Sequence, residues 1–219
     1  MVQETFAWLL GGNELRFTEQ TLEWKDYLIN EADFDPARVR VYCNPFWNIE
    51  VLDQTDDFFD YVRAEDPQQD VVVMYNGHGL EGSFCPTSGN YPIAYEELAV
   101  RINHPGRTLF INETCHAGSA IPIFRRHGLI PKGSVLASCK GNEKSYGTAY
   151  FRTLLDSLTN HEPYRRSKVE SEVVETVGVN EDPKDKKFRP TTKLIEKRIK
   201  HVQHPRRMGA CLDYLLFPQ

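Results

Sequence analysis

Short apolar runs alternate with amphipathic stretches along most of the chain. Apolar runs at residues 6–10, 39–43, 70–75, 109–111 and 134–139 predict strands. Apolar residues at the spacing of a helix with one buried face occupy residues 18–30, 51–62, 95–102 and 151–158. The repeated order of strand, loop and helix predicts an α/β fold, a three-layer sandwich of about six mostly parallel strands with helices on both faces. A run at residues 210–217 predicts the sixth strand.

One stretch interrupts this pattern. Residues 160–192 are rich in charge, contain Pro163, Pro183 and Pro190, and show no apolar periodicity, so they predict a mobile surface loop. A basic helix is expected at residues 193–202. The 219 residues are otherwise suited to one hydrophobic core, and we expect a single domain over residues 1–219.

Composition and charge exclude several classes of protein. The net charge of −5 argues against a nucleic-acid surface, and the mean hydropathy of −0.50 argues against a membrane protein. The first residues have no basic leader or long apolar run, so no signal peptide is predicted. The five cysteines are widely spaced without a CxxC pair, which favours neither a disulfide framework nor a zinc site. A cytoplasmic location is expected.

Chemically useful side chains follow two consecutive buried strands. His78 lies between glycines after the strand at 70–75, and Cys115 follows the strand at 109–111. In open parallel sheets the functional crevice lies at the carboxyl ends of the strands, so neighbouring strands would bring this imidazole and this thiol together. A third loop, at residues 140–146 after the strand at 134–139, is expected at the same edge.

A thiol and an imidazole in contact form a nucleophile and its proton carrier. The amides of Gly79 and Cys115 are candidates for an oxyanion hole. Each residue alone has a simpler interpretation, because a cysteine after a strand is often a small core residue and a histidine between glycines is often part of a turn. Their placement at consecutive strand ends favours the catalytic interpretation.

Two motifs resemble those of the caspase-like cysteine peptidases, most closely the metacaspases and their bacterial relatives, with legumains second. YNGHG at residues 75–79 resembles the metacaspase signature YSGHG, and ETCHAG at residues 113–118 resembles DSCHSG. The resemblance implies a caspase-like fold and a cysteine endopeptidase with His78 and Cys115 as the catalytic dyad. It also implies a protein or peptide substrate, with an activating partner protein as one means of control.

The resemblance also suggests a substrate preference. Glu113 stands where metacaspases carry an acidic residue that binds Arg or Lys before the scissile bond, and where legumains carry a glutamate near an Asn pocket. Caspases have Gln at this position, so cleavage after Asp is not expected. Glu143 is a second candidate contact for a basic side chain. Cleavage after Arg or Lys is therefore predicted.

Other functions remain open at this stage. A caspase-like adaptor without activity and a legumain-like, Asn-directed peptidase or transamidase are the alternatives. Some metacaspases require calcium, and acidic residues here could suggest it, but no EF-hand spacing is present, so no metal and no cofactor are predicted. The acidic residues in question are Asp56, Asp57, Glu181, Asp182 and Asp185.

Overall fold

The structure is a computed structural model, and it describes residues 5–43, 70–85, 92–101, 107–129, 133–145, 149–159 and 206–209. Its elements follow the chain in a regular order of strands and helices. The strands are β1 (Phe6–Gly11), β2 (Val39–Tyr42), β3 (Val71–Asn76), β4 (His78–Leu80), β5 (Ser83–Cys85), β6 (Ile93–Ala94), β7 (Thr108–Glu113), β8 (Ser134–Ala137) and β9 (Arg206–Gly209). The helices are α1 (Leu15–Asn30), α3 (Tyr95–Arg101), α4 (Ala120–Arg126) and α5 (Ala149–Thr159), with the short 3-10 helices η1 (Pro36–Arg38) and η2 (Ala117–Ser119).

In the part of the chain that the structure describes, the central sheet has six strands in the order β2-β1-β3-β7-β8-β9. Five strands are parallel, and only β9, at one edge of this sheet, runs antiparallel. β3 and β7 are direct neighbours, with Val71 opposite Thr108 and Asn76 opposite Glu113. This arrangement confirms the predicted α/β fold with a mostly parallel sheet.

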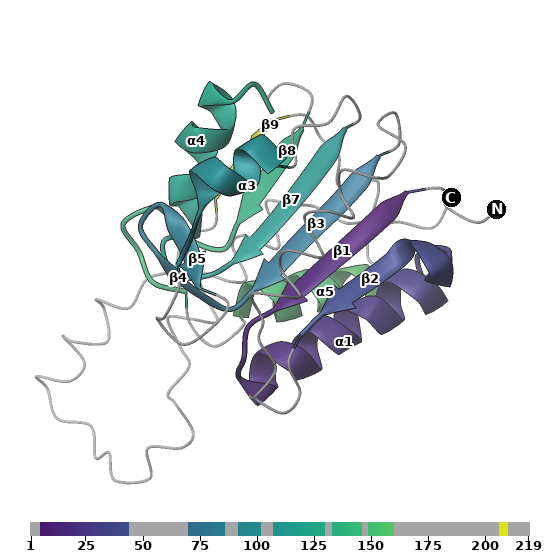
Figure 1. The fold of residues 1–219 in the computed structure, drawn as a ribbon. Helices are drawn as coiled ribbons and strands as arrows, with labels where there is room; N and C mark the ends of the chain where they lie inside the picture. The colour runs from purple at the N-terminus through teal and green to yellow at the C-terminus, as the bar shows by residue number, and fades with distance from the viewer. Residues whose placement is uncertain are drawn as a thin grey trace, which may run out of the picture.

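Helices cover both faces of the sheet, as Figure 1 shows. Successive side chains of a strand point to opposite faces, and the buried residues accordingly divide into two clusters. Trp8, Val73 and Phe110 pack with α3 and α4 on one face. Leu9, Met74 and Ile111 pack with α1 and α5 on the other. The three layers are therefore helices, sheet and helices.

A second, smaller sheet follows directly after β3, where the apolar pattern predicted no strand. β4, β5 and β6 form an antiparallel sheet in that order, with His78 opposite Cys85. The prediction is wrong here because each strand has only two or three residues, too few to show a hydrophobic period. Phe84 and Ile93 are buried by this sheet, and Gly82 makes its tight turn with φ +79°.

Several sequence predictions fall at or beyond the limits of the described residues. α1 begins at Leu15, three residues before the predicted start, and ends at Asn30 as predicted. The described part of β9 precedes the run at 210–217 that predicted the last strand. The predictions for residues 51–62, 160–192, 193–202 and 210–217 lie outside the described residues. Across the described ranges, no helix combines the length and apolar character needed to cross a membrane.

Candidate active site

The register of β3 and β7 brings His78 and Cys115 to the same edge of the sheet. Asn76 and Glu113 are paired, and the imidazole and the thiol each follow two residues later along parallel strands. The backbones beyond the strand ends are in close contact as well. A Cβ atom on Gly79 would lie 2.5 Å from the carbonyl oxygen of Cys115, so only glycine allows this approach. The predicted pair of loops is thus brought together.

The turn that carries Cys115 is fixed by hydrogen bonds. His116 has a left-handed backbone, with φ 60°, a conformation that costs a non-glycine residue about 1 kcal/mol. Its amide donates to the carbonyl of Glu143 at 2.7 Å, and its carbonyl accepts from the amide and the hydroxyl of Ser119 at 2.9 and 2.7 Å. The Thr114 hydroxyl donates to the carbonyl of Cys115 at 3.0 Å. The nucleophile candidate therefore sits on a rigid turn.

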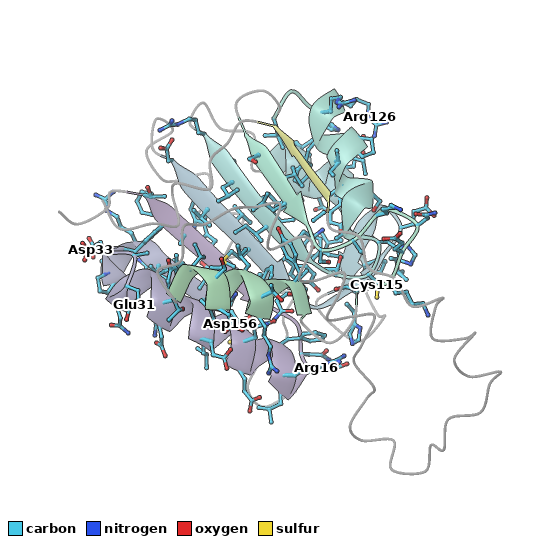
Figure 2. All side chains as sticks on the ribbon, turned by 180° about the vertical axis from the view of Figure 1, so that it is seen from behind. Arg16, Glu31, Asp33, Cys115, Arg126 and Asp156 are labelled. Atoms are coloured by element: carbon cyan, nitrogen blue, oxygen red, sulfur yellow. The ribbon has the colours of Figure 1, made fainter. Side chains whose placement is uncertain are left out.

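The Cys115 side chain lies at the end of the sheet toward which the parallel strands run, where it is labelled in Figure 2. The residue is half-buried, and its sulfur makes one weak contact, 3.8 Å from the carbonyl of Ser145. Among the described residues, the Cys115 amide has no hydrogen-bond acceptor. That amide is therefore available to donate to an oxyanion, and its role in an oxyanion hole stays a prediction.

His78 is held on three sides. Its Nε2 atom forms a short hydrogen bond with a carboxylate oxygen of Glu14. The ring packs edge-on against Phe17, with 5.2 Å between ring centroids. The hydroxyl of Tyr75 donates to the His78 carbonyl at 3.1 Å. With Nε2 engaged, Nδ1 is the ring nitrogen left to exchange a proton with a substrate or with Cys115.

Glu14 comes from the loop after β1 and stands at the N-cap position of α1. Its side chain makes no capping hydrogen bond to this helix, and its second carboxylate oxygen pairs with Arg16 Nε at 2.7 Å. Partial burial acts to raise the pKa of Glu14, but the hydrogen bond from His78 and the charge of Arg16 outweigh it, so the pKa lies below its usual value. Glu14 is therefore a carboxylate at neutral pH.

Glu113 has partners that the sequence prediction did not anticipate. Its residue is only 3% exposed, and its two carboxylate oxygens accept hydrogen bonds from the amides of Tyr150 and Phe151 at 3.0 and 2.6 Å. The side chain thus caps the start of α5. Burial raises the pKa of Glu113 to about 8, against the opposing effect of these amides.

Glu143 belongs to the loop that supports the Cys115 turn. Its carboxylate accepts from the Lys140 amide at 3.2 Å and pairs with the Lys140 ammonium group, also at 3.2 Å. Its carbonyl is the acceptor for His116. Both carboxylates predicted to bind a basic substrate therefore have partners within the protein.

The other described cysteines differ from Cys115 in their surroundings. Cys139 is fully buried and its thiol donates to the carbonyl of Thr114 at 3.3 Å. Burial raises the pKa of Cys139 to about 11 and also raises the pKa of Cys43 and of Cys85. These three thiols are therefore held in the unreactive, protonated form.

Glu14 is the member of the site that the sequence analysis missed. The sequence analysis expects site residues only in the loops after the strands at 70–75, 109–111 and 134–139, and Glu14 lies in the loop after β1. That loop, residues 12–14, ends in a carboxylate, and β1 is the other neighbour of β3. The missing information was the strand order, which a single sequence does not state.

No metal-binding group of three or more His, Cys, Asp or Glu side chains occurs within the residues that the structure describes. The five acidic residues that could suggest calcium lie outside them.

Comparison with known proteins supports the fold alone. No family model matches this sequence, and no curated protein matches it. Among solved structures, the chain is similar to the crystal structure of protein GSU0716 from Geobacter sulfurreducens. The sequence identity is 14% and the TM-score 0.58, and the alignment covers 98% of this chain and 97% of that one. The two proteins therefore share an architecture over essentially their whole length.

Proposed function

We propose that this protein is a cysteine endopeptidase in which Cys115 is the nucleophile and His78 carries the proton. The observation that supports it most directly is the contact between the two strand-end loops, where Gly79 lies against the carbonyl of Cys115 beyond the paired positions Asn76 and Glu113. The resemblance of both loops to caspase-like motifs points to the same chemistry. Buried core cysteines do not need a strained turn, a partly exposed position or an amide left without an acceptor.

The reaction follows from these positions. His78 Nδ1 takes the thiol proton, and the Cys115 thiolate attacks the scissile carbonyl carbon to form a C–S bond. The resulting oxyanion is stabilised by the Cys115 amide, with the Gly79 amide as the second candidate donor. The C–N bond then breaks as the His78 imidazolium gives its proton to the leaving amine. Water attacks the thioester while His78 accepts one of its protons, the C–S bond breaks to release the acid, and His78 returns the proton to the Cys115 sulfur.

The predicted preference for Arg or Lys remains a prediction. It was based on Glu113 and Glu143, and the first caps α5 while the second pairs with Lys140. Neither hydrogen-bond pattern adds support to a primary pocket that binds a basic side chain of the substrate.

A peptide-based electrophile tests the nucleophile directly. Incubation with a panel of peptidyl acyloxymethyl ketones that differ in the residue before the reactive group, Arg, Lys, Asn or Asp, is expected to label one thiol, at Cys115, as measured by intact mass and peptide mapping. The matching fluorogenic peptides are expected to be cleaved. Cys115→Ala is expected to lose labelling and to cut kcat/KM by at least about a thousandfold, because no other side chain replaces the nucleophile.

Cys43→Ala is the matched control, since Cys43 is also half-buried and follows β2, which β1 separates from β3 in the sheet. It is expected to leave labelling and turnover unchanged. Labelling that persists in Cys115→Ala and disappears in Cys43→Ala contradicts the proposal. A wild-type protein that is folded yet neither labelled nor active favours the adaptor instead.

A further inference from the structure

The carboxylate of Glu14 forms a hydrogen bond with His78 and does not cap α1, the helix that Glu14 precedes. An N-cap side chain ordinarily accepts from the first amides of the helix that it precedes. Glu14 makes no such bond to α1, and its two oxygens bind His78 Nε2 and Arg16. The helix start is thus left without a side-chain cap while the imidazole gains a charged partner.

We propose that Glu14 is a positioning residue that completes a Cys115–His78–Glu14 arrangement. Its carboxylate holds the proton of His78 on Nε2, directs Nδ1 toward the thiol and stabilises the imidazolium formed during the reaction. This inference rests on the proposed peptidase function for its catalytic meaning, although the hydrogen bond itself does not.

Three contacts make Glu14 a rigid partner. Asn76, two residues before His78, donates from its side-chain amide to Gln20 of α1 at 2.7 Å in a buried position. The Phe17 ring, from the first turn of α1, packs edge-on against the imidazole. Arg16 fixes the second oxygen of Glu14. The start of α1 is therefore docked on the end of β3, and Figure 2 shows Arg16 and Cys115 at the same end of the molecule.

The charge of Glu14 has a definite consequence for His78. A carboxylate hydrogen-bonded to one ring nitrogen fixes the tautomer, and its negative charge favours the protonated ring. An amide in its place can accept from or donate to Nε2, so it fixes neither. The titratable or charged groups around the histidine among the described residues are Glu14, Arg16, Cys115, Tyr75 through its bond to the His78 carbonyl, and Cys85 across the β4–β5 pair.

The test compares Glu14→Gln with Glu19→Gln, which removes the same charge from an exposed position of the same helix. Glu14→Gln is expected to lower kcat by about tenfold to a hundredfold with KM nearly unchanged, because Glu14 orients the base without touching the substrate. Glu19→Gln is expected to match the wild type.

Two measurements keep this inference separate from the peptidase assignment. Nitrogen-15 NMR of the His78 ring is expected to show Nε2–H in the wild type and a mixture of tautomers in Glu14→Gln. The rate of Cys115 alkylation by iodoacetamide is expected to change in the same variant. If the wild type cleaves no peptide but both changes occur, the positioning role stands and the peptidase assignment fails. If the wild type cleaves peptides and Glu14→Gln keeps its kcat and its His78 tautomer, the positioning role is wrong.

Discussion

Glu14 and Glu113 lie on either side of β3, the strand that precedes His78, and their environments are opposite. β3 lies between β1 and β7, so Glu14 follows one neighbour and Glu113 ends the other. Glu14 is partly exposed, with its pKa lowered by His78 and Arg16. Glu113 is buried, with its pKa raised to about 8. Glu113 is close to Cys115 in the sequence, but Glu14 is the carboxylate that contacts His78.

The direction of the side chain explains the difference. Leu109 and Ile111 of β7 pack on the face covered by α1 and α5. Glu113 has the same parity, so its side chain also points to that face and meets the first amides of α5. Glu14 lies in the loop beyond β1, where strand alternation no longer applies, and it can turn toward His78.

Of the tests of this comparison, replacing each of the two glutamates by alanine is expected to have the largest effect, on the free energy of unfolding. Glu113→Ala removes the acceptor of two buried amides and should lower the free energy of unfolding by about 2–4 kcal/mol. Glu14→Ala should cost less than about 1 kcal/mol, since its ion pairs are partly exposed, while it should impair turnover. Urea denaturation of both variants, with kcat measured on the folded fraction, checks the contrast. Equal losses of stability in the two variants would contradict it.

The second effect is a pH dependence of opposite sign for the two carboxyl groups. The folded-state pKa of Glu113, about 8, lies above the ordinary value of 4.5, so the folded protein binds the extra proton between these values. Its contribution to stability is complete below about pH 4.5 and is lost as pH rises to about 8, at up to about 1.4 kcal/mol per pH unit. The lowered pKa of Glu14 acts the other way, and its contribution is lost only as pH falls through that pKa.

Urea denaturation of the wild type and of Glu113→Gln from pH 5 to 9 isolates this contribution, because the remaining groups cancel in the difference. The stability advantage of the wild type is expected to shrink as pH rises through this range. A constant difference would show that Glu113 is ionised throughout.

The core and the strand-end pair were accessible from the sequence. Each buried strand of the central sheet contains a run of apolar residues, and the apolar spacing of residues 151–158 predicted α5 correctly. His78 and Cys115 could be placed together because parallel strands deliver their carboxyl ends to one edge. The helix α4 lies between Cys115 and the next strand, with Ile121 and Phe124 buried.

The partners of the two glutamates were not accessible in the same way. The role of Glu113 depends on where α5 begins relative to β7, which is a matter of tertiary packing. The contact of Glu14 with His78 depends on β1 lying beside β3 in the sheet, although β2 comes between these two strands along the chain. The hairpin that carries His78 was missed because its strands are too short to show a period.

A smaller effect is expected when the two loops are pushed apart. Gly79→Ala would place a Cβ 2.5 Å from the Cys115 carbonyl and 2.6 Å from the Thr114 Cβ, so the backbone must shift at a cost of about 1–3 kcal/mol. Peptide cleavage should fall by at least about tenfold because His78 and Cys115 move relative to each other. The control is Gly82→Ala in the same hairpin, which has a positive φ but nothing within 4 Å of the added Cβ. It should lose stability, by about 1 kcal/mol, and keep its activity; equal activity losses in the two variants would contradict the contact.

The smallest effect is expected on substrate selectivity, and it decides what Glu113 does. A carboxylate in the primary pocket would favour Arg over Asp, and its replacement by Gln would lower kcat/KM for Arg peptides by roughly tenfold to several hundredfold. In the structure both oxygens accept from α5, and with a pKa near 8 the group is mostly neutral at pH 7. The ratio of kcat/KM for Arg and Asp peptides is therefore expected to change by less than about threefold in Glu113→Gln at pH 7. Lys140→Ala, which leaves the Glu143 carboxylate without its ammonium partner, is the companion variant, and Arg preference should increase in it if Glu143 reaches the substrate. A tenfold or greater fall in the ratio in Glu113→Gln would restore Glu113 to the substrate pocket and show that α5 releases it when a basic side chain binds.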